Sequence, residues 1–131
     1  ESPILAEGRI GFHKVQGIAD GLIPPILDLE IIDGIVQVPS DEAMETARMM
    51  ARKEGIFCGT SSGCNVAAAL KAARHFPDAR CIVTIINDNG LRYLSTELCG
   101  APAERKLLDR EYRVSDEDLA RLKARNYLII K

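Results

Sequence analysis

The segment with the clearest chemical potential is residues 59–63, Gly-Thr-Ser-Ser-Gly, which lies between a short apolar run and an alanine-rich stretch. Its G-x-S-x-G pattern is typical of a nucleophile elbow, with Ser61 at a strand-to-helix turn. Such a serine needs an acid and then a histidine further along the chain. The next histidine is His75, and no Asp or Glu lies between it and Ser61. On one helix the two residues would be about 21 Å apart, so the sequence argues against a serine hydrolase.

The same segment also allows two interpretations without a nucleophile. Free backbone N–H groups at a helix N-terminus, beside the hydroxyls of residues 60–62, favour acceptor atoms or anions and predict a ligand site. A Gly/Ser-rich helix start that binds nothing fits the local pattern as well. A metal site has little support, because His13 and His75 are the only histidines and no two of the four cysteines have C-x-x-C spacing.

Hydrophobic patterning predicts the elements that position this segment. Residues 34–38 are a short β-branched run that predicts a strand, and Ser40 is the expected N-cap of a helix that ends at Gly55. An alanine-rich helix is expected over residues 65–74. The run at residues 80–86 (RCIVTII) is apolar on both faces and is expected to form a central parallel strand.

The remaining parts of the chain have weaker patterns. Residues 1–17 are expected to be loop, followed by a short helical turn over residues 18–23. One or two helical turns are expected over residues 92–98, and Ser115 is the expected start of a further helix. Residues 127–130 are expected to form a final strand or a docked tail.

The alternation of strands and helices predicts an α/β fold. In open sheets of this class ligands bind at the carboxyl ends of strands, where the turns at residues 59–63 and 87–90 are expected. The 131 residues are 47% hydrophobic with a formal net charge of −2, which indicates one globular domain and argues against a nucleic-acid partner. No apolar stretch is long enough for a membrane span. The four cysteines predict reduced, mostly buried thiols in a cytoplasmic protein.

Three segments, in this order, resemble the cysteine synthase and cystathionine β-synthase family of pyridoxal-phosphate (PLP) enzymes. Residues 13–24 (HKVQGIADGLIP) are similar to the family's H-K-I-Q-G-I-G-x-G-F-I-P, and residues 59–63 to its G-I-S-S-G. Residues 90–96 (GLRYLST) are similar to G-E-R-Y-L-S-T, and residues 40–43 to the helix start S-D-E-A. The resemblance covers about residues 1–99, and it is the combination of segments that makes it specific.

The resemblance implies a partial three-layer parallel-sheet domain of a fold-type-II PLP enzyme, in which an activated serine exchanges its β-substituent for sulfide or a thiol. In the family the first serine of S-S-G, here Ser61, hydrogen-bonds the pyridine nitrogen of the cofactor. Gly17 lies in the segment that approaches the active site, where a residue without a side chain lets the backbone come close. Asn87 lies at the strand end that borders the ring, where the family usually has proline. Ser61, Gly17 and Asn87 are therefore the expected cofactor-binding residues.

Several family segments do not occur in this sequence: the S-x-K-x-R segment with the Schiff-base lysine, the Gly/Thr-rich phosphate loop and the T-S-G-N-T-like loop. Lys14 does not match the Schiff-base lysine. We therefore expect residues 1–99 to be the C-terminal part of the PLP-binding domain, residues 100–131 to be an extension of unknown role, and no residue of the chain alone to be catalytic. For the complete enzyme the resemblance implies a small amino-acid substrate and a homo-oligomer. The alternative hypothesis is a non-catalytic binding or regulatory half-domain that pairs with another chain.

Overall fold

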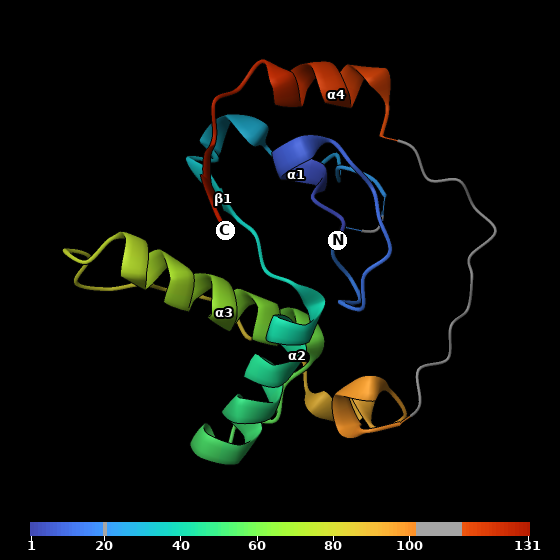
Figure 1. The fold of residues 1–131 in the computed structure, drawn as a ribbon, viewed down its shortest axis with the longest axis vertical. Coiled ribbons are helices and arrows are strands. Elements are labelled where there is room, and N and C mark those ends of the chain that lie inside the picture. Colours follow the sequence, from blue (N-terminus) through green and yellow to red (C-terminus); the bar gives the residue numbers. More distant parts are fainter. Residues whose placement is uncertain (20, 102–113) are drawn as a thin grey trace.

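The computed structural model describes residues 1–19, 21–101 and 114–131, which form an α/β fold (Figure 1). Its helices and strands are α1 (Ile4–Glu7), β1 (Gly34–Val36), α2 (Ser40–Met49), α3 (Thr60–His75), α4 (Asp116–Lys123) and β2 (Leu128–Ile130). The shorter turns are the 3-10 segments η1 (Leu29–Ile31), η3 (Gly90–Tyr93) and η4 (Glu97–Cys99), together with the π-helical segment η2 (Met50–Glu54) that continues α2.

The two strands pair with each other in parallel, with Ile35 of β1 opposite Ile129 of β2. The strand predicted at residues 34–38 is present over residues 34–36, and of the two interpretations of residues 127–130 the structure has the strand. The α/β class with a parallel sheet is confirmed. α4 leads into β2, and it begins where the sequence predicts. Ser115 is its N-cap, and the Ser115 hydroxyl accepts the backbone N–H of Asp118 at 3.1 Å.

Two groups of buried side chains hold these elements together. The first joins the N-terminal segment to the α4 segment around Leu29, which is only 2% exposed; its members are Ile4, Ile23, Leu29, Val114 and Leu122. The second lies between α2 and the turns that follow α3; its members are Met44, Ala47, Cys58, Tyr93 and Leu98. Figure 1 accordingly shows α1 and α4 together at one end of the molecule and α2 and α3 at the other.

α3 packs closely on α2 because a glycine lies at the point of contact. A Cβ atom at Gly63 would lie 2.1 Å from the carbonyl oxygen of Ala43 and 2.8 Å from the Cβ of Ala47. Lys71 of α3 forms an ion pair with Glu42 at 2.7 Å and donates to the backbone carbonyl of Gln37 at 2.9 Å. These contacts fix α3 against α2 and the β1 segment, and so fix the position of its N-terminus.

The predicted helices are present as α2 and α3, but the predicted capping role of Ser40 is wrong. Pro39 occupies the N-cap and Ser40 is the first helical residue of α2. The Ser40 hydroxyl is used for tertiary contacts instead: it accepts the backbone N–H of Lys14 at 2.9 Å and hydrogen-bonds the Glu1 carboxylate. After η2 the helix ends at Gly55, in the left-handed conformation with φ 69°, as predicted.

The N-terminal segment differs from expectation in two ways. α1 forms within residues 1–17, which were expected to be loop, and Gly8 ends it with φ 65°. The described part of residues 18–23 is not helical. Ala19 and Gly21 there have φ values of 55° and 94°, which an α-helix does not allow. The turns expected over residues 92–98 are present as η3 and η4.

The central strand predicted at residues 80–86 is wrong for this structure, in which residues 81–87 have no strand pairing. The segment runs back beside α3, and Asn65 Nδ2 of that helix donates to the carbonyl oxygen of Ile85 at 2.9 Å. Val83 is 85% exposed and Ile85 is 66% exposed. A strand needs a neighbour to complete its hydrogen-bond ladder, and no such neighbour lies beside this segment in the described part of the chain.

Candidate functional site

The N-terminus of α3 brings together two of the three predicted site residues. Ser61 lies in the first turn of this 16-residue helix and is 7% exposed. Asn87 lies at the end of the returning segment, and its side-chain Nδ2 donates a hydrogen bond to Ser61 Oγ at 3.2 Å. No residue among those described accepts the Ser61 hydroxyl proton. Ser61 therefore presents an unused hydrogen-bond donor.

The turn that carries Asn87 is anchored to the residues around Ser61. The backbone N–H of Asn87 donates to Ser62 Oγ at 2.9 Å, and Ser62 is fully buried. An antiparallel β-bridge joins Asn89 to Cys58, just before the start of α3. The turns at residues 59–63 and 87–90, which the sequence predicts at the ligand-binding edge, therefore lie side by side.

The half-buried Asp88 and the buried Tyr93 form a polar pair behind this turn. The Tyr93 hydroxyl donates to Asp88 Oδ2 at 2.7 Å, and burial together with this hydrogen bond raises the pKa of Tyr93 above its ordinary value. A Cβ atom at Gly59 would lie 2.3 Å from Asp88 Oδ1, so the glycine is needed for close approach. From the sequence Tyr93 was expected only to pack the short helix; the signal for its hydrogen bond was the phenol, because a buried tyrosine hydroxyl usually finds a partner.

Two buried polar atoms next to Ser61 have no hydrogen-bond partner within the described residues. They are Thr60 Oγ1 and Asp88 Oδ1. A buried donor or acceptor without a partner is costly, on the order of 1–3 kcal/mol. Their presence beside Ser61 indicates a polar site whose hydrogen bonds are not all satisfied from within this part of the protein.

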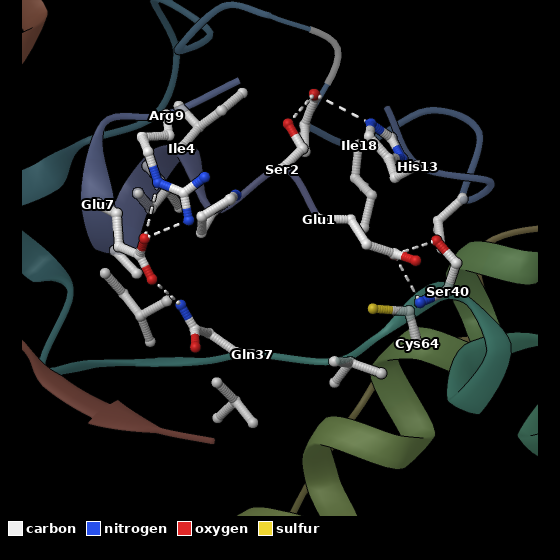
Figure 2. A pocket seen from close by; sticks show the side chains of 18 of the residues that line it. Glu1, Ser2, Ile4, Glu7, Arg9, His13, Ile18, Gln37, Ser40 and Cys64 are labelled. Carbon is white, nitrogen blue, oxygen red and sulfur yellow. Dashed lines mark hydrogen bonds and ion pairs between the residues drawn. The ribbon is translucent and has the colours of Figure 1, made fainter. Parts of the chain in front are cut away.

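Gly17, the third predicted site residue, lies at a separate cavity of about 650 Å³, which neither Ser61 nor Asn87 lines. Its φ of 86° requires glycine, and a Cβ atom there would have no neighbour within 4 Å. Cys64, which follows Ser61 by one turn of α3, lines the same cavity. Figure 2 shows the Cys64 side chain directed toward the space beside Glu1 and Ser40. The cavity therefore reaches α3 at Cys64, three residues after Ser61.

Lys14 is held in ion pairs and is not free to act as an amine nucleophile. Its Nζ lies 3.0 Å from Glu97 Oε2 and 3.3 Å from Asp41 Oδ1. The hydrogen bonds to Glu97 and Asp41 raise the pKa of Lys14 above its ordinary value. The ammonium form is therefore stabilised, which agrees with the sequence interpretation that Lys14 is not the cofactor lysine.

The cysteines differ in exposure, so the prediction of mostly buried thiols is wrong for two of the four. Cys58 is buried and Cys64 is half-buried, whereas Cys81 and Cys99 are exposed. Burial raises the pKa of the Cys58 thiol, and the charge of Asp88 adds to this shift. Burial also raises the pKa of the Cys64 thiol.

We expect Ellman's reagent to modify Cys81 and Cys99 quickly at neutral pH, and Cys58 and Cys64 at least about tenfold more slowly, because only the accessible thiolate reacts. Mass spectrometry of the labelled peptides over time measures this difference. In denaturant all four thiols should react at similar rates. Labelling of Cys58 as fast as that of Cys81 in the native protein would contradict the burial described above.

Metal-ligand clusters and membrane-spanning helices are both absent from residues 1–19, 21–101 and 114–131. These residues contain no group of three or more His, Cys, Asp and Glu side chains arranged to hold a metal ion. Among these residues, no helix has both the length and the apolar character that crossing a bilayer requires.

The sequence matches the family of pyridoxal-phosphate dependent enzymes over residues 3–88, and the chain therefore belongs to this family. It is 48% identical over 97 residues to cysteine synthase B of Campylobacter jejuni, a match that covers 74% of this chain and 32% of that enzyme. It is 45% identical over 97 residues to cysteine synthase of Staphylococcus aureus, covering 74% and 31%. The chain spans about a third of the length of these relatives.

Solved structures give the same family and extend the likeness along the chain. The cysteine synthase of Entamoeba histolytica aligns with a TM-score of 0.72 and 33% identity, covering 97% of this chain and 36% of that one. O-ureido-L-serine synthase aligns with a TM-score of 0.70 and 35% identity, covering 92% and 35%. Because this alignment covers 97% of the chain, it includes most of the α4 and β2 segments. The fold is therefore that of the fold-type-II PLP enzymes, whose complete members use PLP.

Proposed function

We propose that this chain is the C-terminal part of a cytoplasmic PLP-dependent enzyme of cysteine biosynthesis, and that it carries the pyridine side of the cofactor site. The reaction is a β-replacement: the Cβ–O bond of an activated serine breaks, and a Cβ–S bond forms to sulfide or a thiol. When bound, PLP supplies the electron withdrawal from the α-carbon that makes this exchange possible. Cysteine synthases among the relatives support this activity.

The hydrogen bonding of Ser61 is the observation that carries this proposal. Ser61 Oγ accepts from Asn87 Nδ2 at 3.2 Å and keeps its own proton available. A hydroxyl donor of this kind fits a pyridine nitrogen, which is an acceptor. A neutral hydroxyl, unlike a carboxylate, does not hold that nitrogen protonated. The resulting weaker electron withdrawal favours loss of a β-substituent over transamination.

Gly17 and Asn87 complete the proposed cofactor-binding set. Gly17 combines a left-handed backbone with open space around it, so backbone at this point is able to approach a ligand closely. Asn87 contacts Ser61 directly. The cavity that Gly17 lines reaches Cys64, one turn along α3 from Ser61. A small amino-acid substrate is proposed to enter on this side.

The assembly and location of the enzyme are also proposals. Large apolar side chains are exposed along the segment after α3, including Val83 at 85% and Ile85 at 66%. Exposed apolar surface of this kind is typical of a face that other protein covers, here the rest of the enzyme. From the family resemblance we propose that the complete enzyme is a homo-oligomer. All four cysteines are free thiols, which supports a reducing compartment such as the cytoplasm.

We expect the chain alone to be inactive, because its sequence lacks the family's Schiff-base lysine and phosphate-loop segments. Addition of PLP should give no absorbance band near the visible edge, and O-acetylserine with sulfide should give no cysteine. Spectrophotometry and a cysteine assay measure these outcomes. A clear band with turnover from the chain alone would contradict this expectation.

A chimera tests the proposed activity itself. Residues of this chain replace the matching third of Campylobacter jejuni cysteine synthase B, which supplies the rest of an enzyme of this family. We expect the chimera to form cysteine and Ser61→Ala to lower the rate at least about tenfold, the cost of leaving a polar group without its partner. Ser95→Ala, at an exposed serine, is the matched control and should be neutral. A folded chimera without PLP binding would instead favour the non-catalytic half-domain.

A further inference from the structure

We propose that Asn87 is a positioning residue that directs the O–H of Ser61 away from itself, so that Ser61 donates its hydrogen bond to the pyridine nitrogen. This inference rests on the proposed function and adds a separate element to it. The role belongs to the side-chain amide of Asn87, which acts through Ser61.

The first step of the argument is that Asn87 donates to two consecutive hydroxyls. Its backbone N–H donates to Ser62 Oγ at 2.9 Å, and its side-chain Nδ2 donates to Ser61 Oγ at 3.2 Å. Both serines are buried, with exposed fractions of 0% and 7%. A single residue therefore uses its backbone N–H and one side-chain N–H on the first turn of α3, and the backbone contact keeps the side-chain contact in place.

The second step concerns the proton of Ser61. A serine hydroxyl carries one donor and rotates to suit its partners. With Asn87 Nδ2 occupying an acceptor position on Ser61 Oγ, the O–H bond must point elsewhere. No described residue accepts that proton. The O–H is therefore available to a ligand acceptor such as a pyridine nitrogen, and one of the two acceptor positions of Ser61 Oγ is already occupied by Asn87.

The third step is the effect of charge. An aspartate at position 87 has no side-chain donor and accepts the Ser61 proton, so the hydroxyl turns away from the ligand. Its negative charge lies beside the N-terminus of a 16-residue helix, where a carboxylate stays ionised. Asn87→Asp should therefore reverse the polarity of the site, from one that binds a neutral pyridine to one that stabilises a pyridinium.

The first measurement uses the holoenzyme that contains this sequence, reconstituted with PLP labelled with ¹⁵N in the ring. We expect a ring ¹⁵N resonance of a neutral, hydrogen-bonded pyridine in the wild type, and a move toward the pyridinium position in Asn87→Asp. PLP affinity should fall about tenfold, consistent with loss of one orienting hydrogen bond. The matched control is Asn89→Asp. It adds the same charge in the same turn and retains the acceptor that caps Leu91 N at 2.8 Å.

The second measurement uses the chain without cofactor and follows the Asn87 side-chain NH₂ signals by NMR. Ser61→Ala removes the acceptor, and we expect these signals to shift while those of Asn89 stay unchanged. Unshifted Asn87 signals would overturn the inference, and so would equal ring ¹⁵N shifts in Asn87→Asp and Asn89→Asp. If Ser61→Ala shifts the Asn87 signals but leaves the ring ¹⁵N resonance of the holoenzyme unchanged, the contact stands and the proposed cofactor role of Ser61 fails.

Discussion

Gly63→Val should destabilise the protein by about 3 kcal/mol or more, because the added side chain meets backbone that cannot move aside. A Cβ atom at this position would lie 2.1 Å from the Ala43 carbonyl oxygen and 2.8 Å from the Ala47 backbone nitrogen. α2 and α3 would have to separate, and Ser61 would move with α3. Urea denaturation followed by circular dichroism gives the change in the free energy of unfolding.

The control for this substitution is Ala73→Val, on the same helix. Ala73 is exposed, so the added methyl groups cost only the small loss of helix propensity, about 0.5 kcal/mol. If Gly63→Val and Ala73→Val lowered the unfolding midpoint equally, close packing of α2 on α3 at Gly63 would be refuted.

Leu29→Ala should cost about 2–5 kcal/mol, because Leu29 is only 2% exposed and fills the centre of the first buried group. Leu122 and Val114 of the α4 segment pack in the same group. Loss of Leu29 should therefore loosen α4 and β2 first. Hydrogen exchange of the residues 116–130 backbone should speed up before that of α3 changes.

Ile31→Ala is the matched control for this second substitution. Ile31 lies in the same turn, η1, but is 76% exposed, so its truncation removes little buried surface. A loss of stability in Ile31→Ala as large as that in Leu29→Ala would show that the turn itself, and not the buried group, holds the α4 segment.

The helices were predictable because their signals are local. The Ser115 cap, the Gly55 stop and the alanine-rich stretch of α3 each depend on neighbours in the sequence, and each is present in the structure. α1 was missed although Gly8 ends it with φ 65°, since a four-residue helix has too few positions to show a period. Ser40 was assigned a cap by the same local rule, but its hydroxyl is used by Lys14 from a distant part of the chain.

Composition alone wrongly predicted a strand at residues 80–86. β-branched residues indicate that a segment suits a sheet, but a sheet also needs a partner strand, which the segment itself does not encode. Here Ile85 accepts a hydrogen bond from Asn65 of α3 instead. The sheet that does form pairs β1 with β2, two segments whose individual patterns are short and weak.

The candidate site was predictable as two turns but not as a set of contacts. The position of Ser61 and Asn87 after apolar runs indicates that the turns lie on one edge, and the structure joins them at 3.2 Å. The Asp88–Tyr93 hydrogen bond and the separate cavity at Gly17 depend on how η3 and the N-terminal segment fold back. Contacts between segments that are far apart in the chain produce no periodic pattern of residues in the sequence.

The register of the small sheet has a consequence for synthesis of the protein. Gly34 pairs with Leu128, so β1 leaves the ribosome long before its only described partner strand exists. Closing so long a loop has an entropic cost that grows with its length, and contacts of high sequence separation form slowly. β1 and β2 therefore pair with each other only after the intervening residues are translated.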